Sequence, residues 1–77
     1  MAMNTNPGWN PPKTTDIREA DAFLTGIEND RLGLAVHLDF AREGFYDLYG
    51  HVAETEEDDA IVIEWAFEQA YYAWLER

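Results

Sequence analysis

LGLAVHLDFAREGFYDLYGHVA, residues 32–53, fits two different secondary structures, and the fold class depends on which of them forms. Large apolar residues occupy every even position from Leu32 to Phe40, an alternation typical of a half-buried strand. The same segment also contains an apolar stripe at helical spacing, made of Leu34, Ala35, Leu38, Ala41, Phe45, Leu48, Tyr49 and Val52. Hydrophobic periodicity alone therefore does not decide between a strand pair and a helix.

The glycines of this segment favour the strand interpretation. Gly33, Gly44 and Gly50 would each cost the interior of a helix about 1 kcal/mol relative to Ala. In a hairpin, by contrast, residues 41–44 suit a type I turn in which Gly44 supplies the left-handed φ of a glycine bulge. We therefore predict an antiparallel β-hairpin.

The predicted turn also fixes the register of the two strands. A slip of one residue would place Leu38 opposite Asp47 and would destroy an otherwise apolar face. The predicted register pairs Ala41 with Phe45, Phe40 with Tyr46, Leu38 with Leu48, Val36 with Gly50, and Leu34 with Val52.

Helices are predicted on both sides of the hairpin. Asp16 can cap the first helix, and Glu19 can reach back to complete a capping box. The second helix is expected from about Glu56 to the C-terminus, with Thr55 and Asp58 forming its capping box. In the first helix, the apolar residues that recur at helical spacing are Ile17, Ala20, Phe23, Leu24 and Ile27.

The predicted fold is therefore α+β, a small α-β-β-α domain in which the hairpin packs against a long C-terminal helix and a shorter N-terminal one; an all-α helical bundle is the alternative. Seventy-seven residues allow one domain, which we place at residues 15–77. Residues 1–14 hold three prolines and three asparagines, and they predict a flexible arm. Trp9 is expected either to stay in water, the commoner case for a terminus, or to pack back onto the domain.

Charge narrows the range of partners. Sixteen acids and five bases give a formal net charge of −11. Because affinity for nucleic acids and anionic membranes depends on Lys and Arg, direct binding to either is not expected. A basic protein surface is the natural partner, although acidity can also serve solubility alone. The chain has no Cys and no stretch long and apolar enough to span a membrane, and a cytoplasmic location is expected.

Acidic residues are concentrated at and within the second predicted helix. Five of the six residues 54–59 are acidic, whereas capping needs one or two acids. No Lys or Arg occurs from Glu54 to Glu76. The residues predicted to bind a basic partner are Glu54, Glu56, Glu57, Asp58, Asp59, Glu64 and Glu68, together with Asp39 and Asp47 of the hairpin.

The second helix also has more apolar surface than a solvated face usually carries. Ile61, Trp65, Tyr72 and Leu75 lie on the side away from its main apolar stripe, which consists of Val62, Ile63, Ala66, Phe67, Ala70, Ala73 and Trp74. Either the first helix covers these four residues, or another chain does, as in a homodimer.

The second face of the predicted hairpin would bring together a group of side chains that could bind a metal or act in catalysis. It would place Asp39 opposite Asp47 and His37 opposite Tyr49, with His51 nearby. Two carboxylates beside two imidazoles could bind a divalent metal or share a proton. A solvated sheet face is the commoner explanation, and so small a chain has little room for a closed pocket. We therefore expect no enzymatic activity, metal or cofactor.

The predicted function is that of a small acidic inhibitor that occupies a basic, nucleic-acid-binding surface of a target protein. Carboxylates spaced along a helix can imitate a row of phosphates, and such binding would weaken steeply as salt rises. The analogy is with phage and plasmid proteins that block restriction or CRISPR complexes, and it rests on size and charge alone. The alternatives are an antitoxin or immunity-type protein that neutralises one basic enzyme, and a structural homo-oligomer.

Overall fold

The described part of the chain is all-α. The computed structural model describes residues 9–28 and 37–76, with the side chains of residues 27 and 28 left out. It contains three helices, α1 (Ile17–Glu28), α2 (His37–Tyr49) and α3 (Glu56–Leu75), and no strand within these residues. The α+β prediction is therefore wrong, and the all-α alternative is correct.

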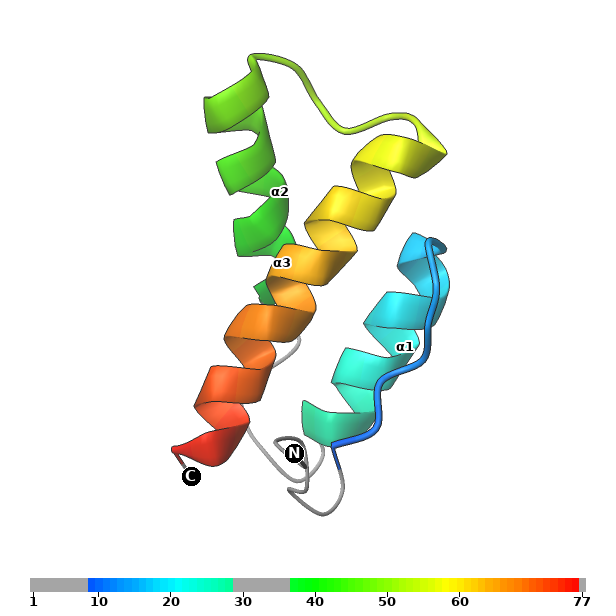
Figure 1. The fold of residues 1–77 in the computed structure, drawn as a ribbon, viewed down its shortest axis with the longest axis vertical. Helices are drawn as coiled ribbons and strands as arrows, with labels where there is room; N and C mark the ends of the chain where they lie inside the picture. The colour runs from blue at the N-terminus through cyan, green and yellow to red at the C-terminus, as the bar shows by residue number, and fades with distance from the viewer. Residues whose placement is uncertain (1–8, 29–36, 77) are drawn as a thin grey trace, which may run out of the picture.

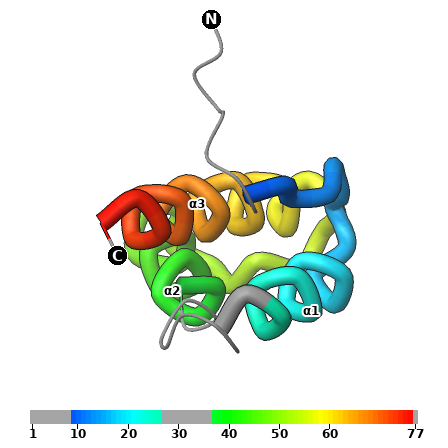
Figure 2. Tube along the Cα trace, turned by 90° about the horizontal axis from the view of Figure 1, so that it is seen from below, coloured from blue at the N-terminus to red at the C-terminus, as the bar shows by residue number. Residues whose placement is uncertain are grey.

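The three helices alternate in direction. Figure 1 shows α1 and α3 running one way and α2 running the other. Seen along the bundle, α3 lies above the two shorter helices, with α2 below it to the left and α1 below it to the right (Figure 2). The contact of α3 with α2 is more extensive than its contact with α1. The long C-terminal helix therefore organises the fold, as a partner for both shorter helices.

Residues 37–49 form a helix because a helix buries their largest apolar stripe. Leu38, Ala41 and Phe45 lie three and four residues apart and are buried together on one face of α2. Burying a Leu or Phe side chain contributes about 1.5–3 kcal/mol each, which exceeds the cost of about 1 kcal/mol for Gly44 in the helix interior. The predicted turn at residues 41–44 is therefore absent, and its cross-strand pairs, such as Leu38 with Leu48, do not form.

Gly50 ends α2 instead of pairing with Val36. It has a φ of +83°, the left-handed conformation that a Cβ disfavours. Its backbone N–H donates a hydrogen bond of 2.8 Å to the carbonyl oxygen of Tyr46, which satisfies one of the terminal carbonyls of the helix. Gly50 is thus a helix stop and not an argument against the helix. Residues 32–36, the first part of the predicted hairpin, lie outside the described residues.

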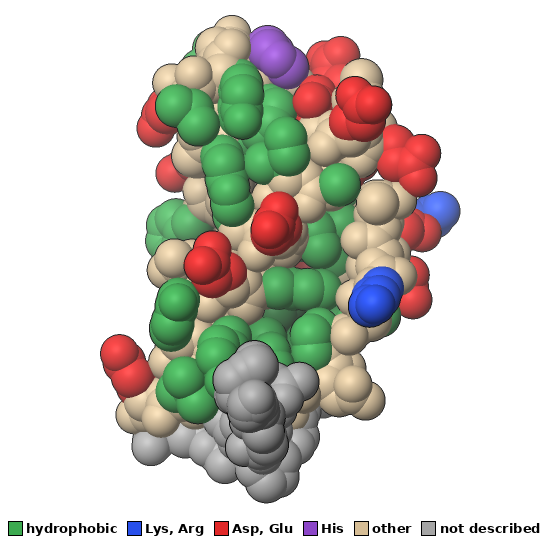
Figure 3. Space-filling model, in the orientation of Figure 1, with side chains coloured by type: hydrophobic (Ala, Val, Ile, Leu, Met, Phe, Trp, Pro, Cys, Tyr) green, Lys and Arg blue, Asp and Glu red, His purple; other side chains and the backbone are tan. Residues whose placement is uncertain are grey.

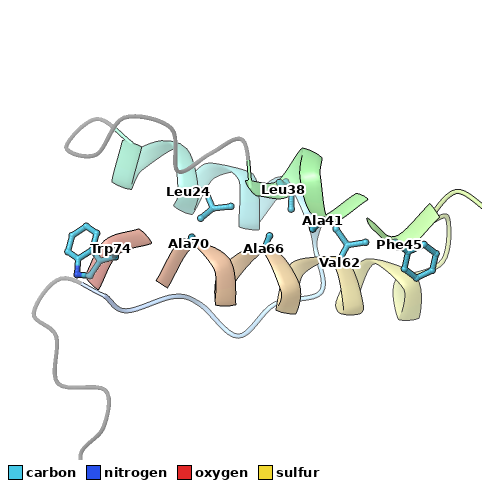
Figure 4. Close-up of a cluster of buried hydrophobic side chains, with 8 residues drawn as sticks. All are labelled: Leu24, Leu38, Ala41, Phe45, Val62, Ala66, Ala70 and Trp74. Atoms are coloured by element: carbon cyan, nitrogen blue, oxygen red, sulfur yellow. The ribbon is translucent and has the colours of Figure 1, made fainter. Parts of the chain in front are cut away.

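The core is a single stripe of α3 covered by the other two helices. Its members on α3 recur every four residues, and Ala66 and Ala70 are small enough to let the neighbouring helices come close. Figure 4 shows the buried cluster, which consists of Leu24 from α1, Leu38, Ala41 and Phe45 from α2, and Val62, Ala66, Ala70 and Trp74 from α3.

Side-chain caps begin α1 and α3 where the sequence predicts them. The Asp16 carboxylate accepts a 2.9 Å hydrogen bond from the N–H of Arg18. Thr55 Oγ1 accepts one of 3.0 Å from the N–H of Asp58. The return bond differs slightly from a standard capping box, because Asp58 Oδ2 accepts from the N–H of Glu54, at 3.3 Å, one residue before the cap. The capping roles of Asp16 and Thr55 are confirmed. The return bond predicted from Glu19 is not formed, because the N–H of Asp16 donates to Thr14 Oγ1, at 2.9 Å.

Trp9 packs onto the domain and does not stay in water. Its ring centroid lies 5.4 Å from that of Phe23, 5.5 Å from that of Tyr71 and 6.0 Å from that of Trp74. These contacts cover the seam between α1 and the last turns of α3. The commoner expectation for Trp9 is therefore wrong for this chain, while the flexibility predicted for the first eight residues concerns positions outside the described residues.

Candidate interaction surface

The predicted hairpin site is not assembled. Asp39 and Asp47 were expected to face each other, but they lie in the first and last parts of α2, roughly 12 Å apart along its axis. His37 begins α2, whereas His51 follows its end. Within residues 9–28 and 37–76, no group of three His, Cys, Asp or Glu side chains is placed to hold a metal ion. The metal and proton-sharing hypotheses depended on the strand register and fall with it.

Burial perturbs the imidazole of His37. In the described structure its Nδ1 atom is buried and has no hydrogen-bond partner. Desolvation by this burial lowers the pKa of His37 below its ordinary value of 6.5. The imidazole is therefore mainly neutral at pH 7, and it adds no positive charge to its surroundings.

The acidic run lies at the start of α3. Glu54, Glu56 and Glu57 are exposed, while Asp58 and Asp59 are half-buried. Acids in the first turn of a helix are stabilised by the helix dipole, which explains part of this concentration. In Figure 3 several acidic side chains gather near the end of the molecule at which α3 begins, and others are spread over the rest of this face.

Further acids continue along the outside of α3. Glu57, Glu64 and Glu68 are exposed and lie seven and four residues apart, so they share the face opposite the buried Ala66. We call these three residues the α3 acidic ridge. Among the described residues no ion pair joins it to a Lys or Arg, in keeping with the absence of either residue type from 54 to 76. Its charge is therefore available to a partner.

Most of the exposed apolar surface belongs to α2 and the turn after it. Phe40 is 64% exposed and Leu48 is 66% exposed, although the hairpin prediction placed both on a buried face. Figure 3 shows hydrophobic surface next to the acidic end of the molecule. The large apolar side chains that remain exposed are Phe40, Tyr46, Leu48, Tyr49 and Val52 in this segment, and Tyr72 and Leu75 near the end of α3.

A groove separates the exposed sides of α2 and α3. Its volume is about 490 Å³, and Gly44 lies in it with no heavy atom within 4 Å of the position a Cβ would take. A second hollow, of about 470 Å³, is lined by residues of α2 and the turn that follows it, among them Arg42 and Val52. We call the groove of about 490 Å³ the α2–α3 groove. Its described lining consists of His37, Phe40, Ala41, Gly44, Trp65 and Gln69.

Of the four apolar residues predicted on the outer side of α3, two are half-buried and two are exposed in the structure. Ile61 and Trp65 are half-buried and pack against the core cluster. Trp65 stacks on Tyr49, with ring centroids 6.4 Å apart and the planes 15° from parallel. Tyr72 and Leu75 stay exposed. The covering element for Trp65 is α2 and not the first helix, which was the expectation.

Sequence reasoning missed Phe40 and Gly44 as surface residues. Both were assigned to the hairpin, Phe40 to its apolar face and Gly44 to its turn. The helical interpretation of the segment would have predicted both surface positions, because neither Phe40 nor Gly44 belongs to the stripe of Leu38, Ala41 and Phe45. Once that stripe is taken as the buried face, Phe40 and Gly44 must lie to its side.

Comparison with known proteins adds no relative: no family model, curated protein or solved structure matches the chain. Within the described residues, none of the three helices has the length and apolar character needed to cross a membrane.

Proposed function

We propose that this chain is an acidic protein-binding inhibitor that occupies a basic, nucleic-acid-binding surface of a target protein. The observation that carries the proposal is the α3 acidic ridge, Glu57, Glu64 and Glu68, exposed on a helix that has no Lys or Arg from 54 to 76. The acidic run at the start of α3 extends the same charge. A basic target surface would find these carboxylates already exposed and held at fixed spacing on a helix, with no ion pair to any described Lys or Arg to break.

The geometry of the ridge suits imitation of a phosphate row. The first and last of its three carboxylates are eleven residues apart on α3, a rise of roughly 16 Å. One strand of duplex DNA carries a charge about every 3.4 Å, so it presents about five charges over that length. The ridge therefore supplies a lower charge density of the same sign, and the acids of residues 54–59 add to it at one end. A cytosolic site of action belongs to the proposal, and the absence of Cys is compatible with it.

The test is a capture experiment followed by competition. The protein is immobilised, host lysate is applied at low salt, and the proteins eluted by a salt step are identified by mass spectrometry. We expect basic nucleic-acid-binding proteins in the eluate. Each captured protein is then bound to a labelled oligonucleotide, and we expect the chain to displace the oligonucleotide at low salt and to lose this ability as salt rises.

A pair of charge-matched variants separates the ridge from net charge. The triple variant Glu57→Gln, Glu64→Gln, Glu68→Gln removes the ridge, and exposed ion pairs are worth about 0.2–1 kcal/mol each, so we expect roughly tenfold weaker competition. The control Glu19→Gln, Asp21→Asn, Glu43→Gln removes three exposed acids elsewhere and should compete almost as well as the native chain. Equal losses in both variants, or competition that does not respond to salt, would contradict the proposal.

A further inference from the structure

The α2–α3 groove contains a glycine that the fold does not require. Gly44 lies in the middle of α2, and the described structure does not give it a positive φ. No described atom would contact a Cβ added there, so close packing does not explain it either. A glycine inside a helix costs about 1 kcal/mol relative to Ala. What Gly44 does provide is open space in the groove that Phe40 and Trp65 also line, which a long side chain at position 44 would occupy.

The groove has the size and character of a binding site for apolar groups. Its volume of about 490 Å³ falls within the range of roughly 300–1,000 Å³ that is typical of ligand pockets. Phe40 and Trp65 provide large aromatic surfaces, one from each helix, and among the described lining residues Gln69 and His37 have polar side chains. Because the pKa of His37 is lowered, the described part of that lining is mainly neutral at pH 7.

Acidic side chains border the groove on both helices. Asp47 lies three residues after Gly44 and seven after Phe40, and therefore on the same side of α2. Glu68 lies three residues after Trp65 on α3 and is exposed, as is Asp47. A second copy of the chain would bring these carboxylates against their own equivalents, and like charges across an interface are unfavourable. The borders therefore favour a basic occupant.

We propose that the α2–α3 groove binds a basic amphipathic helix of the partner protein, with apolar side chains over Gly44 and Lys or Arg side chains beside Asp47 and Glu68. This inference rests on the proposed function and names the element of the basic target that the chain holds. A groove between two helices accepts a third helix through anchors at i, i+3 or i+4, and i+7. Gly44 allows the backbone of the partner helix to come close to α2. The acids on both sides of the groove attract the Lys and Arg side chains of that helix.

The probe is a synthetic helical peptide of Leu and Lys, about four turns long, with every Leu on one face. A scrambled peptide of the same composition, with Leu spread around the helix, tests for attraction by charge alone. Binding is followed by nuclear magnetic resonance through the indole N–H signals of the protein. We expect the amphipathic peptide to shift the signal of Trp65 and to leave those of Trp9 and Trp74, which pack together on the α1 side of α3, nearly unchanged.

Two glycine variants provide a matched comparison. Gly44→Gln fills the groove with a side chain that favours helix, so a loss of binding cannot be due to unfolding. Gly26→Gln makes the same change in α1, where the Cβ position is also open. We expect Gly44→Gln to weaken the amphipathic peptide about tenfold or more and to abolish the Trp65 shift, whereas Gly26→Gln binds like the native chain.

The outcomes separate the two proposals. If the scrambled peptide binds as well as the amphipathic one, or if Gly44→Gln binds it normally, the groove proposal is overturned while charge-driven binding to a basic surface survives. If neither peptide binds at low salt, both proposals fail. If sedimentation shows a dimer of the native chain that Gly44→Gln dissociates, a second copy occupies the groove and the proposal of a basic helix is wrong.

Discussion

Gly44→Ala tests the fold itself, because the two secondary structures that the sequence allows give it opposite signs. In the predicted hairpin, Gly44 would hold the left-handed φ of a bulge, and Ala would cost about 1–2 kcal/mol there. In α2, Gly44 has helical neighbours on both sides and no positive φ. The same substitution should therefore stabilise the observed fold.

The magnitude follows from the surroundings of the new methyl group. No heavy atom lies within 4 Å of the position that the Cβ of Ala would take, so the methyl causes no clash and gains little burial. What remains is the difference in helix propensity, about 0.8–1.0 kcal/mol in favour of Ala. For a domain of this size, 1 kcal/mol corresponds to a rise in the melting temperature of roughly 4–8 °C.

Gly50→Ala is the internal reference for this experiment. Gly50 has a φ of +83°, so Ala there is strained even though space is available, and we expect a loss of about 1–2 kcal/mol. Thermal and urea unfolding of both variants, followed by circular dichroism, give the two free-energy changes. A destabilised Gly44→Ala variant, or two changes of the same sign, would refute the helical assignment of residues 37–49.

Three further substitutions test the core, the arm and the pH response. Phe45→Ala removes a ring that is 1% exposed and should cost about 3–5 kcal/mol in urea unfolding, unless another side chain fills the space. Trp9→Ala removes the contacts of the arm with Phe23 and Trp74 and should cost about 1–2 kcal/mol, which a melting curve will show. His37 has a lowered pKa, so the unfolded chain takes up its proton at a higher pH than the folded chain. Its contribution to stability is complete above pH 6.5 and is lost as the pH falls below that value, so the melting temperature of the native chain should fall more than that of His37→Gln between about pH 7.5 and about pH 5.5. An equal fall in both proteins would show that other groups control this pH response.

The positions at which α1 and α3 begin could be predicted from the sequence because local capping chemistry determines them. Asp16 and Thr55 begin their helices as expected, since a capping side chain acts within three residues of itself. The stripe of α3 likewise follows from its four-residue spacing. The middle segment could not be predicted in this way, because the choice there depends on what Leu38 and Phe45 contact in α3, and no local rule contains that information.

The candidate site could likewise be predicted only in part. The acids of α3 could be named from the sequence because a helix that was correctly predicted places them. Asp39 and Asp47 were instead assigned to one site by a strand register, and a helix puts them roughly 12 Å apart. The groove at Gly44 had no sequence signal of its own, since it exists only where α2 and α3 lie against each other.

The segment that misled the sequence interpretation is also the one that lines the groove, and the two facts have a common cause. A helix that only had to cover α3 would need one apolar face, and its period would be unambiguous. Residues 37–49 carry a buried face at Leu38 and Phe45 and also several exposed apolar residues, among them Phe40, with Gly44 near it at a cost of about 1 kcal/mol. That extra apolar surface is what makes the segment also alternate like a strand. Natural chains break local rules at functional or strained sites, and a partner that covers Phe40 would account for both the ambiguous pattern and the unfavourable glycine.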